Sequence, residues 1–587
     1  MFKHSVSNYD KEPYIAVEGY EHHVWQGIQS ISEELILKIT TLQKQKIVVV
    51  LDMYHGVFEN EIISRLSATI KFDDILSVST VNHSDTEIDN LLSNNITDDR
   101  VFGILSCHQM QHFFNPEKAE ILKNKIMAYE SGLILVYGIG ASFILQGDIL
   151  IYADMARWEI QQRMRKNEIA NWCSQNYKLD YMQRYKRAFF IDWRVLDRHK
   201  QNILRKADYL LDTNNRIIDK MITGEAFFSA LAQATSRPIR LVPFFDPGIW
   251  GGQWMKEVCD LDSAQPNFAW CFDCVPEENS MILKFGEIKI EIPSINLVFL
   301  YPDQLLGRHV HARFGLEFPI RFDFLDTMNG DNLSLQVHPF TEYIQNMFGM
   351  HYTQDESYYI LDAKEDATVY LGLKDSIDSE IMLDELTTAQ AGIKPFDANK
   401  FINVFPARKH DHFMIPAGTI HCAGKNAMVL EISATPYIFT FKLWDWGRVG
   451  LDGLPRPIHL EHGKNVIAWD RTTDWVKENL VNPVKLIREY DGIIEEQTGL
   501  HELEFIETRR HWSKNKVVHQ TKGVFNVLNL VEGSEAIVES PSNAFEPFVV
   551  HYTETFIIPA AVGEYTIRPF NSSIGKEIAT IKAYVRI

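Results

Sequence analysis

The hydrophobic pattern of the chain changes near residue 235, and this change constrains the fold more than any other feature. Before residue 235, runs of Val, Ile and Leu alternate with charged stretches whose apolar residues recur at helical spacing. Strands that are almost wholly apolar and separated by helices are typical of a parallel sheet with both faces covered. We therefore predict an α/β domain over residues 1–235. Its predicted strands are 47–51, 101–105, 133–136 and 149–152, and its clearest helical patterns are 115–130 and 158–171.

After residue 235 the chain consists of short β-branched and aromatic runs separated by Gly, Pro, Asn and Asp. This pattern is typical of antiparallel sandwiches and barrels. One block occurs twice, as Ile415-Pro-Ala-Gly-Thr-Ile-His421 and as Ile558-Pro-Ala-Ala-Val-Gly-Glu564. Each copy follows an apolar strand and precedes another, as expected at a proline-fixed turn in a jelly roll. We predict two jelly-roll domains, residues 236–480 and 481–587, with Glu564 at the position that His421 occupies in the first copy.

The composition argues against several classes of partner. Of the 587 residues, 58 are Lys or Arg and 78 are Asp or Glu, which gives a formal net charge of −20. Nucleic acids and anionic membranes bind clustered Lys and Arg, so neither is expected as a partner. The N-terminus has no signal-peptide pattern, and the longest apolar stretch, Gly132–Leu145, is shorter than the roughly 20 residues that span a bilayer. Six cysteines are too few for a disulfide framework, so a cytoplasmic protein is expected.

A set of nitrogen and oxygen side chains in the second segment has the chemistry of a metal site. Gln336 and His338 are two residues apart on a predicted strand, so both project from one face. Glu356 begins another apolar run, and His421 follows a tight turn. Two imidazoles, one carboxylate and one amide oxygen suit zinc, although other divalent ions accept the same donors. A mixed site of this kind with open coordination positions is typical of catalysis.

Seven blocks of this segment follow one another in the order found in a known family. They are Arg240–Gly252, Phe318–Asp326, Leu333–Pro339, Glu356–Ala363, Ile415–His421, Asp445–Arg448 and Arg456–His459. Through these blocks the segment resembles type I phosphomannose isomerase, a family of zinc enzymes with cupin domains. The resemblance implies that the two jelly rolls are cupins and that one Zn²⁺ per chain is held by Gln336, His338, Glu356 and His421. It also implies an isomerase that interconverts mannose 6-phosphate and fructose 6-phosphate through an enediol, with a small-molecule sugar phosphate as its partner.

Charged residues outside this ligand set depart in part from the family pattern. Arg448 and Arg456 stand at arginine positions of the family, and Lys442 stands where an arginine is usual, so Arg448 and Lys442 are the predicted catalytic residues. Gln354 and Asp323 stand where the family has lysines. Phosphate affinity is expected to fall, because a carboxylate close to a phosphate repels it. The alternative function is a carbohydrate-binding or regulatory cupin that retains zinc but has little or no turnover.

The first segment weakly resembles nucleoside kinases of the P-loop class, through Gly132–Gly138, Asp148–Asp154 and the arginine-bearing stretch Arg157–Arg165. A P-loop needs the pattern G-x-x-x-x-G-K-[ST] to hold phosphates. The first strand is instead followed by Asp52-Met-Tyr-His-Gly-Val-Phe-Glu59, which has no Lys and no pair of glycines. We predict a degenerate scaffold, and we expect neither nucleotide binding nor phosphorylation of the sugar by this domain.

Overall fold

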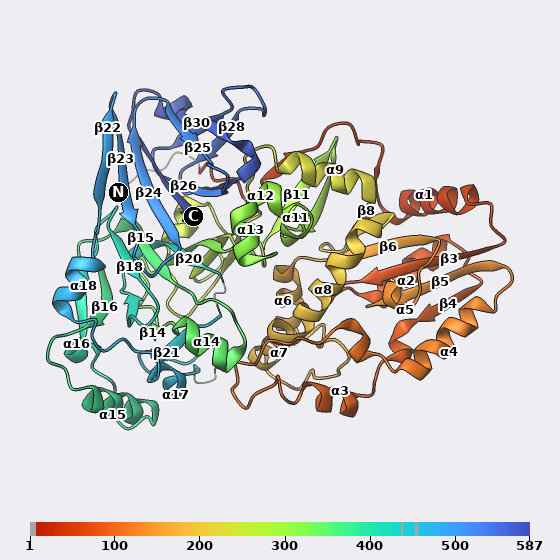
Figure 1. The fold of residues 1–587 in the computed structure, drawn as a ribbon, viewed down its shortest axis with the longest axis horizontal. Coiled ribbons are helices and arrows are strands. Elements are labelled where there is room, and N and C mark those ends of the chain that lie inside the picture. The colour runs from red at the N-terminus through yellow and green to blue at the C-terminus, as the bar shows by residue number, and fades with distance from the viewer. Residues whose placement is uncertain (1–6, 436–437, 452, 454–455) are drawn as a thin grey trace. The chain divides into compact units, whose positions relative to one another are not determined.

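The computed structural model describes the chain except for residues 1–6, 436–437, 452 and 454–455 (Figure 1). The chain divides into two compact units. The α/β unit comprises Tyr14–Gln233 and Ser280–Leu300, and the β unit comprises Met1–Pro13, Ala234–Asn279 and Tyr301–Ile587. Both predicted jelly-roll segments thus lie in one compact unit, whereas the stretch 280–300 groups with the N-terminal part of the chain.

The α/β unit contains a seven-stranded sheet in which five neighbouring strands are parallel, as predicted, and two more pair antiparallel at one edge. The predicted strands 47–51, 133–136 and 149–152 lie within three of the parallel strands. Val49, Val50 and Leu51 are buried, as expected for a strand with neighbours on both sides. In sheet order the strands are β2 (Val24–Gln26), β8 (Lys220–Thr223), β7 (Tyr209–Asp212), β6 (Ile149–Asp154), β3 (Lys46–Met53), β5 (Gly132–Gly138) and β4 (Asp74–Ser77).

Both predicted helical patterns are helices. The first begins after Asn115, whose side chain accepts a hydrogen bond from the Lys118 N–H at 3.0 Å, with a proline in the first turn. The second ends earlier than predicted, because Asn167 has a φ of 59° and leaves the helical region. The helices of this unit are α1 (Ile28–Thr41), α2 (Glu59–Thr69), α3 (Asp85–Leu92), α4 (Pro116–Met127), α5 (Ala141–Ile144), α6 (Arg157–Arg165), α7 (Tyr181–Arg187), α8 (Trp193–Ile203), α9 (Gly224–Ala234) and α11 (Ile295–Leu300).

The predicted strand at 101–105 is wrong, since these residues are in no strand. Their backbone groups are satisfied by a preceding loop. The Asp99 carboxylate accepts hydrogen bonds from the N–H groups of Val101 and Phe102 at 2.6 and 2.7 Å, and the Ile104 N–H donates to the Asn95 carbonyl at 2.9 Å. Local side chains of this kind offer the backbone an alternative to a sheet ladder. The sheet uses β4 instead, which was not predicted.

Residues 280–300 explain why the α/β unit is discontinuous in sequence. They form a hairpin of β11 (Ser280–Phe285) and β12 (Ile288–Pro293), followed by α11. Strand β11 also pairs in parallel with β1 (Tyr14–Ala16), at the start of the same unit. This three-stranded sheet therefore joins two stretches that are more than 250 residues apart in the chain.

The β unit contains two pairs of antiparallel sheets. The first pair consists of a six-stranded sheet, β18 (His412–Ile415), β15 (Glu356–Ala363), β20 (Ala427–Ala434), β13 (Ile320–Asp326), β10 (Trp270–Cys274) and β9 (Phe244–Asp246), and a five-stranded sheet, β17 (Ile402–Pro406), β16 (Thr368–Leu373), β19 (His421–Ala423), β14 (Leu335–Val337) and β21 (Phe441–Trp444). The second pair consists of β22 (Lys485–Tyr490), β23 (Ile493–Gly499), β24 (Ile506–Ser513), β31 (Ile578–Val585), β26 (Asn526–Glu532) and β29 (Thr555–Ile558), with β25 (Val517–Gln520), β30 (Glu564–Pro569), β27 (Glu535–Glu539) and β28 (Phe548–His551).

Short helices connect these strands. They are α10 (Trp254–Val258), α12 (Pro302–Leu305), α13 (Arg308–Phe314), α14 (Thr341–Phe348), α15 (Ser379–Gln390), α16 (Ala398–Phe401), α17 (Leu460–Gly463) and α18 (Thr473–Asn479).

The repeated sequence block occupies the same place in both pairs of sheets. In the first pair it carries the chain from β18 in the six-stranded sheet to β19 in the five-stranded sheet, and His421 is the first residue of β19. In the second pair it carries the chain from β29 to β30, and Glu564 is the first residue of β30. The internal repeat read from the sequence is thus a structural repeat.

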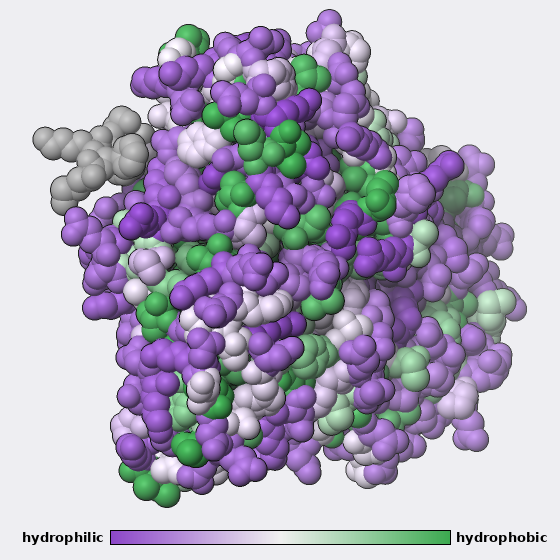
Figure 2. Space-filling model, turned by 60° about the vertical axis from the view of Figure 1, so that its left-hand side comes forward, coloured by the Kyte–Doolittle hydropathy of each residue, from purple (hydrophilic) through white to green (hydrophobic). Residues whose placement is uncertain are grey.

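The described residues include no helix that is long and apolar enough to cross a bilayer. The face of the molecule in Figure 2 is mostly hydrophilic, with apolar side chains in small scattered groups. Scattered apolar groups of this kind are ordinary for a protein surface and do not mark a docking site.

Candidate metal site

The predicted metal ligands come from both sheets of the first pair. Gln336 lies in β14, His338 directly follows that strand, and His421 begins the neighbouring strand β19. Glu356 is the first residue of β15 in the facing sheet. Gln336 and His421 are cross-strand partners, so their side chains project from the same face. The interior between the sheets therefore receives ligands from two sides.

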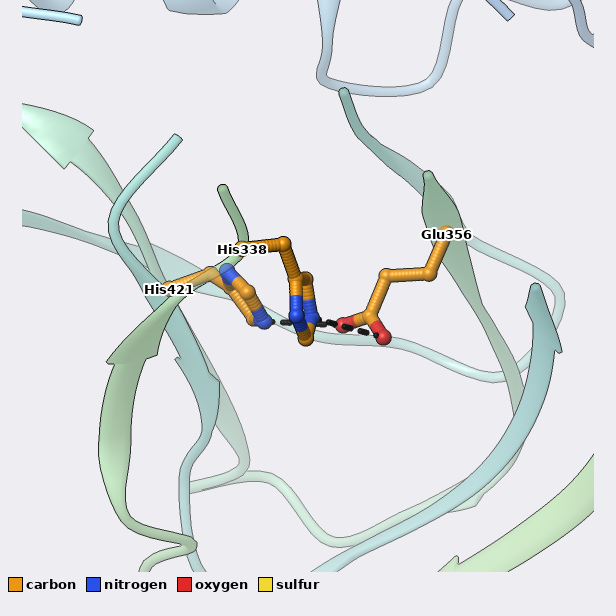
Figure 3. Close-up of side chains that lie close together, drawn as sticks. All are labelled: His338, Glu356 and His421. Carbon is orange, nitrogen blue, oxygen red and sulfur yellow. Dashed lines mark ion pairs between the residues drawn. The ribbon is translucent and has the colours of Figure 1, made fainter. Parts of the chain in front are cut away.

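The two imidazoles and the carboxylate converge on one point (Figure 3). His338 Nε2 lies 3.0 Å from Glu356 Oε2, and His421 Nε2 lies 2.8 Å from Glu356 Oε1. All three side chains are buried. Burial alone would raise the pKa of the Glu356 carboxyl, whereas positive charge on His338 and His421, present only when both rings are protonated, would bring it well below its ordinary value. The three residues are the one cluster of His, Cys, Asp and Glu with metal-site geometry within the described ranges.

Hydrogen bonds at the far side of each ring orient the imidazoles for metal binding. His338 Nδ1 lies 3.0 Å from the Phe439 carbonyl oxygen, and His421 Nδ1 lies 2.8 Å from the Thr419 carbonyl oxygen. A carbonyl oxygen accepts a hydrogen bond but cannot donate one, so the ring nitrogen that faces it must carry the hydrogen. Nδ1 is therefore protonated in both rings, and Nε2 keeps its lone pair. Both lone pairs then face carboxylate oxygens.

This arrangement fits a cation. In the described part of the chain, His338 Nε2 and Glu356 Oε1 are buried atoms without a hydrogen-bond donor. Lone pairs that face each other in a buried site repel one another, and an ion between them removes that cost. The Gln336 amide lies beside them, with its Nε2 3.2 Å from His421 Nε2. All four predicted ligands are thus brought together.

A buried arginine that the sequence analysis missed holds the turn before His421. Arg471 Nη1 donates hydrogen bonds to the carbonyls of Pro416 and Ala417 at 2.8 and 2.7 Å. Gly418 in the same turn has a φ of 89°, and its N–H donates to the His338 carbonyl at 2.9 Å. The turn therefore ties the backbone of one ligand to the position of the other. No sequence motif marks Arg471, because it binds backbone carbonyls about fifty residues away.

Two of the three departures from the family pattern, Gln354 and Asp323, lie among other buried polar groups. Gln354 Nε2 donates to Glu356 Oε2 at 3.1 Å, so this side chain supports a ligand. Asp323 Oδ1 lies 3.1 Å from Arg321 Nε, and Arg321 also pairs with Glu431 on the next strand. Burial raises the pKa of the Asp323 carboxyl to about 7, although Arg321 acts in the opposite direction. Asp323 places a negative charge where the family has a positive lysine. Arg321, two residues earlier on the same strand face, supplies a positive charge next to it.

The predicted catalytic residues gather around one buried carboxylate. Lys442 is the cross-strand partner of Gln336, so its side chain projects from the same face as that ligand. Asp445 Oδ1 lies 2.6 Å from Arg448 Nη2, and Asp445 Oδ2 lies 2.6 Å from Arg456 Nε. Burial, with a smaller effect from the nearby Arg456, lowers the pKa of the Lys442 amine to about 7. Arg448 is fixed by Asp445 and by the Asn332 carbonyl at 2.7 Å.

The curated relatives of the chain are mannose-6-phosphate isomerases, which confirms the resemblance found in the sequence. The chain is 26% identical to mannose-6-phosphate isomerase ManA of Bacillus subtilis over 235 residues, 40% of this chain and 69% of the relative. It is 24% identical to the probable mannose-6-phosphate isomerase GmuF of the same organism over 341 residues, 57% of this chain and 96% of the relative. A crystal structure of the B. subtilis mannose 6-phosphate isomerase matches with a TM-score of 0.48 and 20% identity, over 59% of this chain and 99% of that chain.

The N-terminal part of the chain matches a different family. Residues 8–236 match a family model described as a domain of unknown function, DUF8485. That description names no activity, so the resemblance of this part to nucleoside kinases gains no support. The division of the chain into three domains also stays a prediction.

Proposed function

We propose that this chain is a divalent-metal-dependent isomerase that interconverts mannose 6-phosphate and fructose 6-phosphate. The observation that carries the proposal is the convergence of His338, Glu356 and His421, with buried ligand atoms that have no donor among the described residues. A purely structural cluster would be expected to satisfy these atoms with hydrogen bonds. The names of the curated relatives give the substrate class.

Zinc is the proposed ion, held by the two Nε2 atoms, the Glu356 carboxylate and the Gln336 amide oxygen. Two imidazoles, one carboxylate and one neutral oxygen suit this ion, and the Nδ1 hydrogen bonds are the usual support for zinc-binding histidines. When bound, the ion would supply Lewis-acid stabilisation of the negative charge that develops on the sugar oxygens.

Lys442 is the proposed proton carrier. Isomerisation requires that a proton leave C2 of the aldose and return to C1 of the enediol. An amine whose pKa is about 7 is partly neutral at neutral pH, so it can accept that proton and give it back. Lys442 projects from the same sheet face as Gln336, and its amine has no hydrogen-bond acceptor in the described ranges of the chain.

The phosphate is proposed to bind at the cations around Asp445. Arg448 and Arg456 both pair with Asp445, and Arg448 Nη1 also lies 3.4 Å from Asp331 Oδ2, so a phosphate would share these guanidinium groups with the carboxylates. Fixed guanidinium groups suit a phosphate because each can donate two parallel hydrogen bonds. Arg448 would therefore bind the phosphate with a guanidinium group whose orientation is fixed before the substrate binds.

The test is a coupled isomerase assay on mannose 6-phosphate, with metal-replete protein and with protein treated with a chelator. We expect turnover that the chelator abolishes and that added zinc restores. The variant Lys442→Met should bind metal normally but lose turnover, because it keeps the length of the side chain and lacks the amine. Glu120→Gln, an exposed change in α4, is the matched control and should have full activity.

Absence of turnover from protein that demonstrably contains one ion per chain would contradict the proposal. A metal-containing protein that binds a sugar phosphate without converting it would favour the alternative of a zinc-retaining binding or regulatory protein. Titration of the sugar phosphate by calorimetry on the same preparation distinguishes this alternative from a protein that does not recognise the sugar.

A further inference from the structure

The α/β unit has a cavity of about 500 Å³ that the isomerase proposal does not use. It lies beyond the carboxyl ends of three adjacent parallel strands, β3, β5 and β4. The residues that follow these strands line it, including Gly56 after β3, Ile139 after β5 and Asn82 after β4. The segment 168–177, which follows α6, completes the wall. Its volume is in the range of ordinary small-molecule sites.

The strand order places this cavity where α/β sheets bind ligands. The chain leaves β3 through α2 toward the edge strand β4, and it leaves β5 through α5 toward β6 on the opposite side of β3. The connections from the neighbouring strands β3 and β5 therefore run in opposite directions. Such a reversal separates the loops and opens a crevice at the carboxyl edge of the sheet. The cavity is thus a consequence of the topology.

The lining is a poor match for an anion. Three glutamates, Glu59, Glu61 and Glu168, line the cavity, and none of the described lining residues is Lys or Arg. Glu59 and Glu61 also stand in the first turn of α2, where a phosphate-binding loop would present free N–H groups to an anion. A phosphate in this cavity would meet the carboxylate of Glu59, and the described wall offers no Lys or Arg to hold it.

The lining is also a poor match for a cation. Glu61 and Glu168 are both paired with Arg216, the second at 3.7 Å, so their charge is already balanced. Glu59 has no ion pair or side-chain hydrogen bond in the part of the chain that the structure describes, and burial raises the pKa of its carboxyl. Glu59 is thus the one of these three glutamates whose carboxyl oxygens are left to hydrogen-bond a ligand.

Neutral hydrogen-bonding groups make up much of the remaining wall. The amides of Asn82 and Gln175 and the hydroxyl of Ser174 line it. Trp172 lines the same cavity and is held by stacking on Phe113, with ring centroids 4.3 Å apart. Mixed donors and acceptors beside an aromatic wall match hydroxyl groups on an apolar frame, because each hydroxyl both donates and accepts.

We propose that this cavity binds a neutral polyhydroxylated molecule, an unphosphorylated sugar or sugar alcohol, with the partly buried Glu59 and Asn82 as hydrogen-bonding residues. This site is separate from the proposed isomerase site and does not depend on its activity. It gives the α/β unit a binding function with no phosphoryl transfer.

The test is isothermal titration of the metal-loaded full chain with D-mannose, D-fructose and D-mannitol as probes. We expect saturable binding of at least one probe with one site per chain. Glu59→Gln and Asn82→Ala should each weaken binding about tenfold, which corresponds to about 1.4 kcal/mol. Gln175→Ala, on an exposed part of the loop, should weaken binding less and cannot disturb the core. Glu120→Gln serves as the matched control, and His421→Ala should leave binding at this site unchanged.

Three results would overturn the proposal. The first is that none of the three probes binds at concentrations up to their solubility. The second is that binding is unaffected in Glu59→Gln, Asn82→Ala and Gln175→Ala, or is lost in His421→Ala. The third is displacement of the probe by inorganic phosphate or by putrescine, which would make the cavity an anion or a cation site. Thermal melting of each variant identifies any that fails to fold, and binding is then compared among the variants that do fold.

Discussion

The two pairs of sheets in the β unit share a strand–turn–strand block but use it differently. In the first pair the block ends at His421, which is buried and faces Glu356. In the second pair it ends at Glu564, which is exposed and accepts a hydrogen bond from Gln520 at 2.6 Å. Between the sheets of the second pair lies an apolar cluster that includes Leu528, Phe556 and Ile567.

This difference indicates what the proposed metal site would require beyond the fold. Both turns lead from one sheet to its partner, yet their backbones differ in where the left-handed residue falls. It is Gly418, the fourth residue of the first block, and Gly563, the sixth residue of the second. The first turn is held by Arg471, whereas the second is held by Thr521, whose hydroxyl donates to the Ala560 carbonyl at 2.9 Å. The pair of sheets fixes where the block lies, and the conformation of the turn determines whether the last side chain of the block points between the sheets.

The largest expected effect comes from substitution of His421, the predicted metal ligand at which the two sheet pairs differ. His421→Ala should reduce bound metal from about one ion per chain to background, because it removes a ligand and leaves the Glu356 carboxylate with one imidazole. Glu564→Ala, at the matching position of the second pair, should leave the metal content unchanged. Elemental analysis of the purified variants measures both. Full metal content in His421→Ala would show that the ligand assignment is wrong.

A second prediction concerns the glycines of the two turns. Gly418→Ala should lower the free energy of unfolding by about 2–4 kcal/mol, because a left-handed backbone disfavours Ala and the new Cβ would collide with the ring of Phe340. Gly563→Ala should cost only about 1 kcal/mol, since its φ is also positive but no atom lies within 4 Å of the new Cβ. Urea unfolding compares the two. Equal losses would contradict the packing argument.

The supports of the two turns give a third prediction. Arg471→Ala should weaken metal binding about 10–100-fold, the usual range for residues that orient ligands from behind. Thr521→Val removes the matching support in the second pair and should leave metal affinity unchanged. Competition with a chelator of known affinity measures both. If the two variants bound metal equally well, Arg471 would have no role in orienting His421.

The smallest expected effect is a pH dependence to which each pair contributes one lysine. The pKa of Lys442 is lowered from 10.5 to about 7 in the folded chain, and burial lowers the pKa of Lys582 in β31 to about 8, so above these values the unfolded chain binds the additional protons. The free energy of unfolding should therefore rise with pH across this window, and the rise should be smaller in Lys442→Met, which keeps only the contribution of Lys582. Urea midpoints at pH 6.5 and 9 for both proteins test this. If the urea midpoint changed by the same amount between the two pH values in both proteins, the pKa of the Lys442 amine would not be lowered by burial.

The sequence was sufficient to predict which four side chains converge but not which residues support them. Gln336, His338, Glu356 and His421 could be predicted because each lies in a short block in which strand alternation or a proline turn fixes its direction. Arg471 could not be predicted, because its contacts are with backbone carbonyls and leave no pattern.

Other differences have equally specific causes. Arg321 could have been found, since it is two residues before Asp323 and alternation places both on one face. The apolar run Val101–Leu105 is indistinguishable from a strand until the hydrogen bonds of Asp99 and Asn95 are seen. The cavity of the α/β unit depends on strand order, which hydrophobic periodicity does not contain.

The discontinuity of the α/β unit has a consequence for synthesis of the chain. Strand β1 pairs with β11, and the ribosome makes β11 only after it has made the whole stretch from β2 to β10. The α/β unit therefore cannot be completed as an independent N-terminal domain during translation, even though domains usually fold as their residues emerge. A fragment that ends near residue 235 would lack two strands of this sheet and leave the edge of β1 unpaired.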